Sequence, residues 1–464
     1  MTTPPPTSAF LHSPKLSLLF LSSFVITLLL LYQLNSTQTH PFSNPTYTSL
    51  GLGSITQELQ SKLRDSVTFL PLKDLRFARS PSTGHTWFMS SLEDDWGTPG
   101  QPAHILLPSP ASKDRLLCLS ARNRSDGSSN LYALAFPGAL PRNATLLGGL
   151  TFVSDTYYDH DNLWHGQSSL IPFVAWAESS GCARPDRWVL FHWGELRSGM
   201  GNWVRTLAEA TIGNGVRAEQ LDRYGDGPVC FERAVVCRHN EGGLTQERKG
   251  EVYDMMRCKA REHCNITTMT TTMTRSRSSS GSIRLTLLFR VGARAFKNET
   301  EVAEIFGGEC RKVEGCAMRI ERTNNLTFCD QVKLMAETDI LATPHGAQLT
   351  NMLFMDKNSS VLEFFPKGFQ ELAGVGQHVY QWEAGMAGMR HQGQWQDRDG
   401  EKCPYDNNAD CFTFYKDGKV GHDKDYFAKW MASVLKEVKE LKLSQATQNS
   451  TEAAQGSPSP CPCN

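Results

Sequence analysis

The residues with the clearest chemical potential lie at 345–347, His-Gly-Ala, where an apolar segment over 339–342 ends and a new apolar segment begins. In an open parallel sheet, ligands bind beyond the carboxyl ends of the strands, where helices begin. A glycine there lets a phosphate approach the backbone, and the first amides of the following helix favour an anion. The pattern therefore predicts a diphosphate site. Its expected contacts are His345, Gly346, Ala347, Thr350 and Asn351.

Charged residues flank this stretch at the ends of two other predicted strands. Arg290 and Arg294 surround the exit of the strand expected over 283–291, and a guanidinium can pair with phosphate oxygens through two parallel hydrogen bonds. Glu363 ends the strand expected over 359–366, where its carboxylate can accept hydrogen bonds from ribose hydroxyls. The alternative is that the glycine of the stretch only forms a turn and that its histidine is a surface or capping residue.

The elements that must position these residues alternate regularly in the second half of the chain. Strand-like and helix-like segments follow one another from 283 to 366, which is typical of βαβ units in a parallel, doubly wound α/β sheet. The expected strands are 283–291, 316–322, 339–344 and 359–366, and the expected helices are 298–306, 327–338, 346–354 and 425–441. The first half is less regular. We expect a looser α/β domain there, with strands at 188–193 and 233–238 around a helix at 202–211.

Composition indicates a membrane anchor before the globular part. The segment 16–32 carries no charge and is near the lower length limit for a helix that spans a bilayer. Lys15 before it places the short N-terminal tail in the cytoplasm, although a cleaved signal peptide is the alternative. The predicted organisation is a cytoplasmic tail (1–14), a transmembrane signal anchor (15–34), a stem (35–70), an N-terminal α/β domain (71–266), a flexible loop (267–282), a second α/β domain (283–444) and a disordered tail (445–464).

The cysteines and glycosylation sequons indicate an oxidising, lumenal environment. All 13 cysteines follow the apolar segment, and the odd number leaves at least one of them outside the intramolecular disulfides. The close pairs that we consider as local disulfides are Cys230/Cys237, Cys258/Cys264, Cys310/Cys316 and Cys403/Cys411. The candidate N-glycosylation sites are Asn123, Asn143, Asn265 and Asn358. The formal charge of −1 offers no basic surplus for a nucleic-acid partner.

With these motifs the chain resembles glycosyltransferase family 61, a group of secretory-pathway enzymes that includes plant xylosyl- and arabinosyltransferases and O-linked N-acetylglucosaminyltransferases. The box "HGAQLTNMLF", with "VLEFFP" behind it, resembles the most specific motif of the family. The segment 289–302 resembles its Arg-x3-Arg-x3-Asn-Glu box on Arg290, Arg294, Asn298 and Glu299. In the first half, "DNLWH" resembles the family's Asn-x-x-His element.

The resemblance implies a GT-B-like fold of two Rossmann-like domains with the active site in the cleft. It also implies an inverting mechanism, a nucleotide-sugar donor and no required metal or other cofactor. The domain over 283–444 would bind the nucleotide sugar, and the domain over 71–266 would form the acceptor side. The catalytic candidates, one of which would remove the acceptor's proton, are His165 and Asp161. The expected acceptor-side residues are Asn162, Trp164, Asn202 and Trp203.

One position departs from the family pattern. Several relatives have an aspartate four residues after the histidine of the first-half element, where this chain has Ser169. The departure motivates one alternative, a catalytically inactive carbohydrate-binding member of the same fold. A second alternative is a metal-dependent glycosyltransferase, because Asp-x-Asp triplets occur at 159–161 and 397–399.

The sequence thus predicts a single-pass type II protein of the Golgi membrane, or of the endoplasmic reticulum, with its body in the lumen. Its expected activity is the transfer of xylose, arabinose or N-acetylglucosamine from a UDP-sugar to a glycan or glycoprotein, a cell-wall polysaccharide among the candidates. The expected partners are the nucleotide sugar, the acceptor and, through one N-terminal helix, the membrane.

Overall fold

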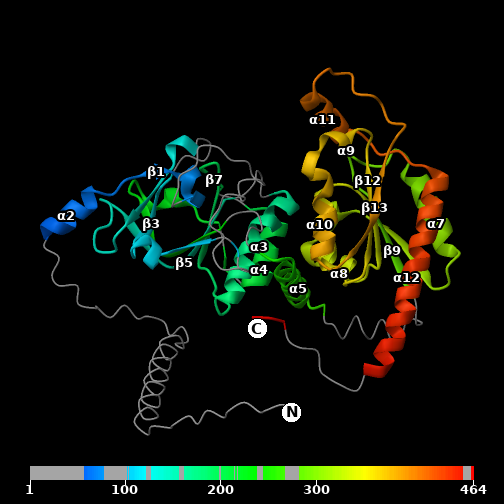
Figure 1. Cartoon of the computed structure of the whole chain (residues 1–464), viewed down its shortest axis with the longest axis horizontal. Coiled ribbons are helices and arrows are strands. Elements are labelled where there is room, and N and C mark those ends of the chain that lie inside the picture. Colours follow the sequence, from blue (N-terminus) through cyan, green and yellow to red (C-terminus); the bar gives the residue numbers. More distant parts are fainter. Residues whose placement is uncertain are drawn as a thin grey trace, which may run out of the picture. The chain divides into compact units, whose positions relative to one another are not determined.

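The computed structural model describes residues 57–77, 102, 104–121, 127–155, 161–197, 200–213, 215–216, 218–237, 244–266, 282–452 and 461–463 (Figure 1). The described residues from Gln60 onward belong to one compact unit. The predicted tail 1–14, the anchor 15–34 and nearly all of the loop 267–282 lie outside the described residues. Within the ranges that are described, no helix is both long and apolar enough to cross a membrane.

Five parallel strands form the sheet of the second half, in the order β10-β9-β11-β12-β13. They are β9 (Ile283–Leu288), β10 (Cys316–Glu321), β11 (Ile340–Pro344), β12 (Ser360–Phe365) and β13 (Arg390–Gln396). The helical elements are α7 (Glu299–Arg311), η6 (Thr323–Asn325), α8 (Phe328–Ala336), η7 (Ala347–Phe354), α9 (Phe369–Leu372), η8 (Gly374–His378), α10 (Val379–Met386), α11 (Asn408–Asp417) and α12 (Lys424–Glu452). Figure 1 shows α7 and α12 on one face of the sheet and α8 and α10 on the other. The predicted doubly wound parallel sheet is confirmed.

Burial along β9 shows that helices cover both faces of this strand. Leu285 and Leu287 pack in one cluster with Phe306 of α7, whereas Leu288 packs in another cluster with Val332 of α8. Alternate residues of a strand point to opposite faces, so a strand with helices on both faces carries apolar residues on both.

The strand order places a topological switch point between β9 and β11. The chain leaves β9 to form β10 on one side and then returns to form β11 on the other side. In open α/β sheets, ligands bind beyond the carboxyl ends of the strands at such a point. Residues 289–294 follow β9 and residues 345–346 follow β11, so the predicted diphosphate residues gather at this edge.

The first half contains a mixed sheet, in the order β1-β4-β3-β8-β5-β6-β7 with β2 paired to β8. The strands are β1 (Leu70–Pro71), β2 (His104–Leu107), β3 (Leu116–Ser120), β4 (Leu131–Ala135), β5 (Thr145–Asp155), β6 (Arg187–His192), β7 (Glu195–Arg197) and β8 (Val229–Cys237). Only β5, β6 and β8 run parallel to one another, and the other pairings are antiparallel. This differs from the expected Rossmann-like domain, whose sheet would be mostly parallel.

The helical elements are α2 (Gln57–Asp65), η1 (Leu72–Phe77), η3 (Pro110–Ser112), η4 (Gly127–Ser129), α3 (Leu163–Ser179), α4 (Asn202–Ile212), η5 (Leu221–Tyr224) and α5 (Gln246–His263).

Helix α5 joins the two sheets. A single hydrophobic cluster contains Phe152 of β5, Val252 of α5 and Leu341 of β11. Arg257 Nε donates a 2.9 Å hydrogen bond to the backbone oxygen of Leu353, on η7. The loop 267–282 thus separates two sheets along the chain, but the described residues on either side share one core.

Disulfides add covalent links that sequence proximity does not reveal. The predicted pairs Cys310–Cys316 and Cys403–Cys411 are confirmed. The pairs Cys230/Cys237 and Cys258/Cys264 are wrong, because their members bond to distant partners or, for the buried Cys237, to none. The observed long-range disulfides are Cys118–Cys230, Cys182–Cys463, Cys258–Cys461 and Cys264–Cys329. The segment 445–464, for which disorder is predicted, therefore begins inside α12 and has its end attached to the first half.

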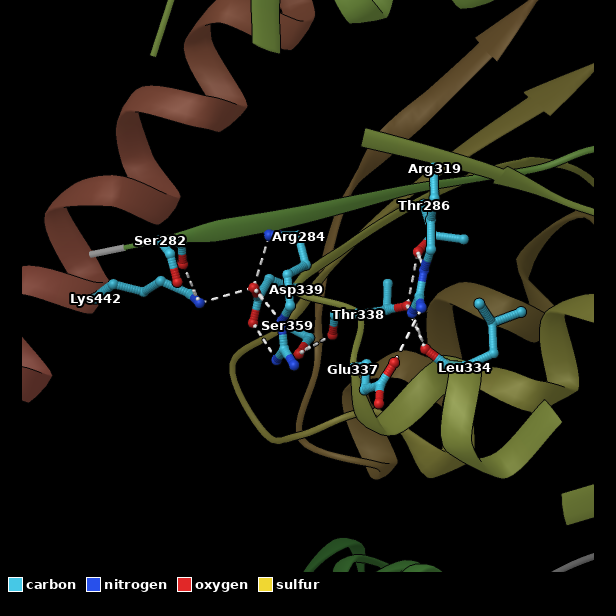
Figure 2. Close-up of polar contacts among 10 residues, drawn as sticks. All are labelled: Ser282, Arg284, Thr286, Arg319, Leu334, Glu337, Thr338, Asp339, Ser359 and Lys442. Carbon is cyan, nitrogen blue, oxygen red and sulfur yellow. Dashed lines mark hydrogen bonds and ion pairs between the residues drawn. The ribbon is translucent and has the colours of Figure 1, made fainter. Parts of the chain in front are cut away.

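Asp339 forms a buried ionic centre at the amino ends of the second sheet (Figure 2). Its Oδ2 accepts hydrogen bonds from the backbone N–H of Arg284 at 2.8 Å and from Arg284 Nε at 3.1 Å. Lys442 Nζ of α12 lies 2.7 Å from the same oxygen and donates to the backbone oxygen of Ser282 at 2.6 Å. Although burial disfavours ionisation, the bonds to Arg284 and Lys442 hold the pKa of Asp339 below its usual range. The carboxylate thus anchors the closing helix to the sheet.

We expect Asp339→Asn to lower the free energy of unfolding at neutral pH by about 2 kcal/mol, because a hydrogen bond to a buried charge contributes roughly 1.5–3 kcal/mol. The folded-state pKa lies below the ordinary value of 3.8, so the wild-type contribution is present above that pH and is lost as the pH falls through the folded-state pKa. Urea unfolding at neutral and acid pH should therefore show a difference between the proteins that shrinks in acid. Asp65→Asn, which removes an exposed pair with Arg142, is the matched control. A difference that does not change with pH would contradict the prediction.

Candidate active site

Arg290 lies at the switch point and joins the ends of β9 and β11. Its NH1 donates a 2.7 Å hydrogen bond to the backbone oxygen of His345. Gly346 makes this contact possible, since its φ is +150° and a Cβ at this position would lie 2.1 Å from NH1 of Arg290. A side chain at position 346 would push the guanidinium away. Gly346 is therefore needed to leave room for Arg290, and not only to form a turn.

Arg294 has a strained backbone in the same region. Its φ is 59°, in the left-handed region that bulky residues seldom adopt, and its N–H donates to the backbone oxygen of Gly418 at 2.8 Å. Its guanidinium lies 5.7 Å from the ring centre of Phe369, whose ring in turn lies 5.0 Å from that of His345. Strain of this kind concentrates at functional sites, and here it brings Arg294 and His345 to one aromatic ring.

The two guanidinium groups are not neutralised by ion pairs within the part of the chain that the structure describes. The Nε atoms of Arg290 and Arg294 are buried there without a hydrogen-bond partner. Burial lowers the pKa of Arg290 to about 10, and the charge of Arg294 adds to this shift. Burial also lowers the pKa of Arg294, whereas the nearby Tyr380 and Asp417 raise it. Both groups stay protonated at neutral pH, so the site holds two partly desolvated, mutually repelling cations that a bound anion would stabilise.

Backbone amides add further donors at the start of η7. This element is a 3-10 helix rather than the expected α-helix, and its first hydrogen bond joins the N–H of Leu349 to the oxygen of Gly346 at 2.9 Å. Over the described residues, no backbone oxygen accepts from the amides of Ala347 and Gln348. The predicted anion site at this corner therefore has unpaired amides beside two cations.

His345 and Glu363 form a buried hydrogen-bonded pair. His345 Nδ1 lies 2.6 Å from Glu363 Oε1, and the other carboxylate oxygen lies 3.0 Å from His391 Nε2 and accepts from Gln394 Nε2 at 3.2 Å. Burial opposes ionisation of Glu363, but the hydrogen bonds from both histidines hold its pKa below the usual range. The glutamate is 0% exposed, so its expected contact with a ribose would need these bonds to be replaced.

His345 is held in its neutral form. Burial lowers the pKa of its imidazole, and Arg290 and Arg294 lower it further, against the effect of Glu363. Since an ionised carboxylate only accepts hydrogen bonds, Nδ1–H of His345 must donate to Glu363, which leaves Nε2 as an acceptor. The rings of Phe365, Phe369 and Tyr380 surround the imidazole at 4.7, 5.0 and 5.1 Å.

Two residues predicted to contact the nucleotide sugar are more buried than expected. Thr350 and Asn351 are fully buried. Asn351 Oδ1 accepts a 3.0 Å hydrogen bond from Nε1 of Trp203, a predicted acceptor-side residue, which also packs against Phe354. Asn351 and Trp203 therefore join α4 to η7, and the ligand contacts expected of them from sequence stay predictions.

The first-half element forms the start of α3, which packs against η7. Asn162 caps this helix through a 3.1 Å hydrogen bond from the N–H of Trp164 to Oδ1. His165 is half-buried in the first turn, and Asp161 is exposed just before it. Ser169 is buried, and its Oγ donates to the backbone oxygen of His165 at 3.0 Å. Ser169 is therefore bonded within its own helix, where an aspartate would point its charge into a buried position.

The two Asp-x-Asp triplets that motivate the metal-dependent alternative lie in different surroundings. Residues 159–160 lie outside the described residues. In the second triplet, Asp397 is buried and accepts hydrogen bonds from Lys297 Nζ at 3.1 Å and from the backbone N–H of Gly421 at 2.8 Å. Its other oxygen accepts from the N–H of Asp399 at 2.9 Å. This carboxylate stabilises a loop.

The remaining predicted site residues lie at the surface. Asn202 begins α4 and accepts a 2.8 Å hydrogen bond from Arg205 through Oδ1. The sequon residues Asn143, Asn265 and Asn358 are all exposed, with φ of 59°, 55° and 65°. Asn123 lies outside the described residues. Exposed asparagines in turns are accessible to modification.

Several neighbours of the site carry no motif signal. His391 and Gln394 of β13 and the rings of Phe369 and Tyr380 come from beyond the "VLEFFP" segment. The parallel pairing of β12 with β13 is what brings Gln394 beside Glu363. An alternation of polar residues in "RHQGQWQ" is the only trace of this contact in the sequence.

Comparison with known proteins identifies the family of this chain. The family model described as Glycosyltransferase 61 matches residues 88–362, which is more than half of the chain. The match contains the first-half helix with His165, both arginines, and the end of β11 with His345. No curated protein matches the chain. On the family match, this chain belongs to the glycosyltransferase 61 family and is a glycosyltransferase.

Proposed function

We propose that the enzyme transfers a sugar from a UDP-sugar to a glycan or glycoprotein acceptor and inverts the anomeric centre. The observation that carries the donor assignment is the pair of half-buried arginines, Arg290 and Arg294, which have no ion pair within the described residues. A diphosphate matches them in charge and in its number of acceptor oxygens.

The neighbouring groups fit the same donor. The amides of Ala347 and Gln348 can donate to phosphate oxygens, and the neutral imidazole of His345 can accept a hydrogen bond through Nε2. Positive charge from two guanidinium groups can stabilise the leaving diphosphate in the transition state, so we propose that transfer requires no metal ion. Xylose, arabinose and N-acetylglucosamine are the candidate sugars, because the resemblance includes enzymes for each.

The general base and the reacting end of the acceptor are assigned to the first half in a GT-B-like arrangement. Helix α3 packs against η7, so His165 is on an element that touches the donor segment. We propose His165 as the general base, with the exposed Asp161 as the second candidate. Six disulfides support an oxidising compartment, in accord with a Golgi or endoplasmic-reticulum lumen and an anchor at 15–34.

The test combines UDP binding with turnover. UDP at a hundred times its dissociation constant should stabilise the protein by about 2.7 kcal/mol, with or without EDTA. The His165→Ala variant should keep this shift and lose release of UDP from the preferred UDP-sugar. Loss of the shift in EDTA, with recovery on adding Mn²⁺, would favour the metal-dependent alternative. A normal shift in wild type with no turnover on any UDP-sugar would favour the inactive, carbohydrate-binding alternative.

A further inference from the structure

A large cavity lies beside the donor site and has no role in the donor assignment. Its volume is about 720 Å³, and it opens between the carboxyl end of β12, helix α11 and the segment 417–419. Aromatic and charged side chains line it, among them Tyr405, Phe414, Tyr415, Glu401, Asp417 and Lys419. A cavity of this size has room for a ligand of two or more sugar rings.

The walls of the cavity are fixed by covalent and hydrogen-bonded contacts. The disulfide Cys403–Cys411 joins the loop that carries Tyr405 to α11. The backbone N–H of Cys403 donates to the hydroxyl of Tyr415 at 3.0 Å. Gly368 has φ +72°, and a Cβ there would lie 2.3 Å from the ring of Tyr415. The ring thus packs against bare backbone, and the cavity is preformed.

The charges of the cavity do not fit a phosphate. It is lined by three lysines and three carboxylates, Lys297, Lys367, Lys419, Glu401, Asp410 and Asp417. Lys297 pairs with Asp397 at 3.1 Å, and Lys367 Nζ donates to the backbone oxygen of Arg398 at 2.8 Å. The net charge of the lining is therefore zero, in contrast to the two arginines of the donor site.

The groups left for a ligand suit a neutral carbohydrate. The carboxylates of Glu401 and Asp417 are exposed and can accept hydrogen bonds from sugar hydroxyls. Tyr405 is 53% exposed, and its ring can pack against the C–H face of a pyranose. Lys419 also forms no ion pair among the described residues, but the two exposed carboxylates outnumber it. These groups beside an exposed aromatic ring favour a polyhydroxylated, uncharged ligand over an anion.

The cavity also shares residues with the donor site. The oxygen of Gly418, in its wall, accepts the hydrogen bond that holds Arg294 in its left-handed conformation. The ring of Phe412 on α11 lies 5.6 Å from that of Phe369, which contacts His345. We propose that this cavity is a binding subsite for the neutral oligosaccharide chain of the acceptor, an assignment that rests on the proposed transfer reaction.

The test uses the full chain on an array of neutral oligosaccharides built from xylose, arabinose, glucose, galactose and N-acetylglucosamine. Wild type should bind at least one chain, and Tyr405→Ala and Glu401→Gln should each weaken that binding by about tenfold, because each removes one contact of the ligand. Tyr426→Ala is the matched control, since Tyr426 is 46% exposed on α12 and does not line the cavity. No binding to any chain, or binding that both cavity variants retain, would overturn the proposal.

UDP binding, measured on the same variants, separates this proposal from the donor assignment. All three variants should keep the thermal shift with UDP. If wild type binds oligosaccharides through Tyr405 but shows no shift with UDP, the donor assignment fails and the subsite stands as a carbohydrate site. If UDP binds and the array shows no dependence on Tyr405, only the subsite fails.

Discussion

Replacing Arg290 with alanine should weaken UDP binding by about 100-fold, because truncating one partner of a charge-assisted hydrogen bond in a partly desolvated site costs roughly 2–5 kcal/mol. The variant loses the guanidinium that bridges the ends of β9 and β11 through the oxygen of His345. Isothermal calorimetry with UDP measures the effect. Arg290→Lys retains the charge without the planar fork, so an intermediate loss is expected.

The stability of the unliganded variant distinguishes a ligand-binding role from a structural one. Burial and, second, the charge of Arg294 lower the pKa of Arg290. Truncating Arg290 removes a costly buried charge together with its hydrogen bond to His345, so the free energy of unfolding should change little. Gly346→Ala should reproduce the loss of affinity without removing a charge, because the new Cβ would displace Arg290. Arg142→Ala, on a side chain that is 74% exposed, is the surface control. Unchanged UDP affinity in Arg290→Ala would exclude the donor site proposed here.

The second sheet could be predicted because its elements are specified locally. Each strand is short and apolar, and the helices between them begin at recognisable caps. Asn298 accepts from the N–H of Glu301 at 3.2 Å at the start of α7, and Thr327 forms a capping box with Asp330 at the start of α8. Asn298 lies in a sequon, and its side chain is used as a cap. A regular alternation of such segments leaves few topologies other than a doubly wound sheet.

The first sheet could not be predicted because its pairings are long-range. β8 pairs with β2, β3 and β5, and none of these neighbours in space is its neighbour in sequence. The antiparallel direction of β2 and β3 relative to β8 could not be read from the sequence, because the segments between these strands show no clear hydrophobic pattern. The same limit applies to cysteines, since spacing alone suggested partners within 10 residues whereas most bonds join distant elements.

The site could be predicted only where one segment carries the chemistry. His345, Gly346 and the two arginines lie in two short motifs, and the parallel sheet brings their ends together. Asn351 and Trp203 were expected to meet ligands, but their polar atoms bond to each other. A motif residue can thus serve the scaffold, because the contact that decides its role comes from the other half of the chain. The cavity beside the donor site is built from residues 297 to 419, which no single motif contains.

The disulfide Cys264–Cys329 should contribute about 4 kcal/mol to stability, because it closes a 65-residue loop and so restricts the unfolded chain. It joins the end of α5 to α8, across the boundary between the two sheets. The double variant Cys264→Ser/Cys329→Ser should show this loss in urea unfolding. The disulfide Cys403–Cys411 closes a loop of only 8 residues. The double variant Cys403→Ser/Cys411→Ser should therefore lose about 2 kcal/mol less stability than the 264–329 variant.

The comparison between the two disulfide variants tests whether the Cys264–Cys329 bond stabilises the protein by closing a long loop. Phe328, next to Cys329, packs against Trp203 with ring centres 5.8 Å apart, so the disulfide holds α8 on the core beneath η7. If loop closure is the main contribution, the 264–329 variant should lose more stability while its UDP affinity, measured well below the unfolding midpoint, stays within about twofold of wild type. A loss equal to that of the 403–411 variant would mean that the shared core of α5, α8 and η7 already holds the two halves together without the covalent bond.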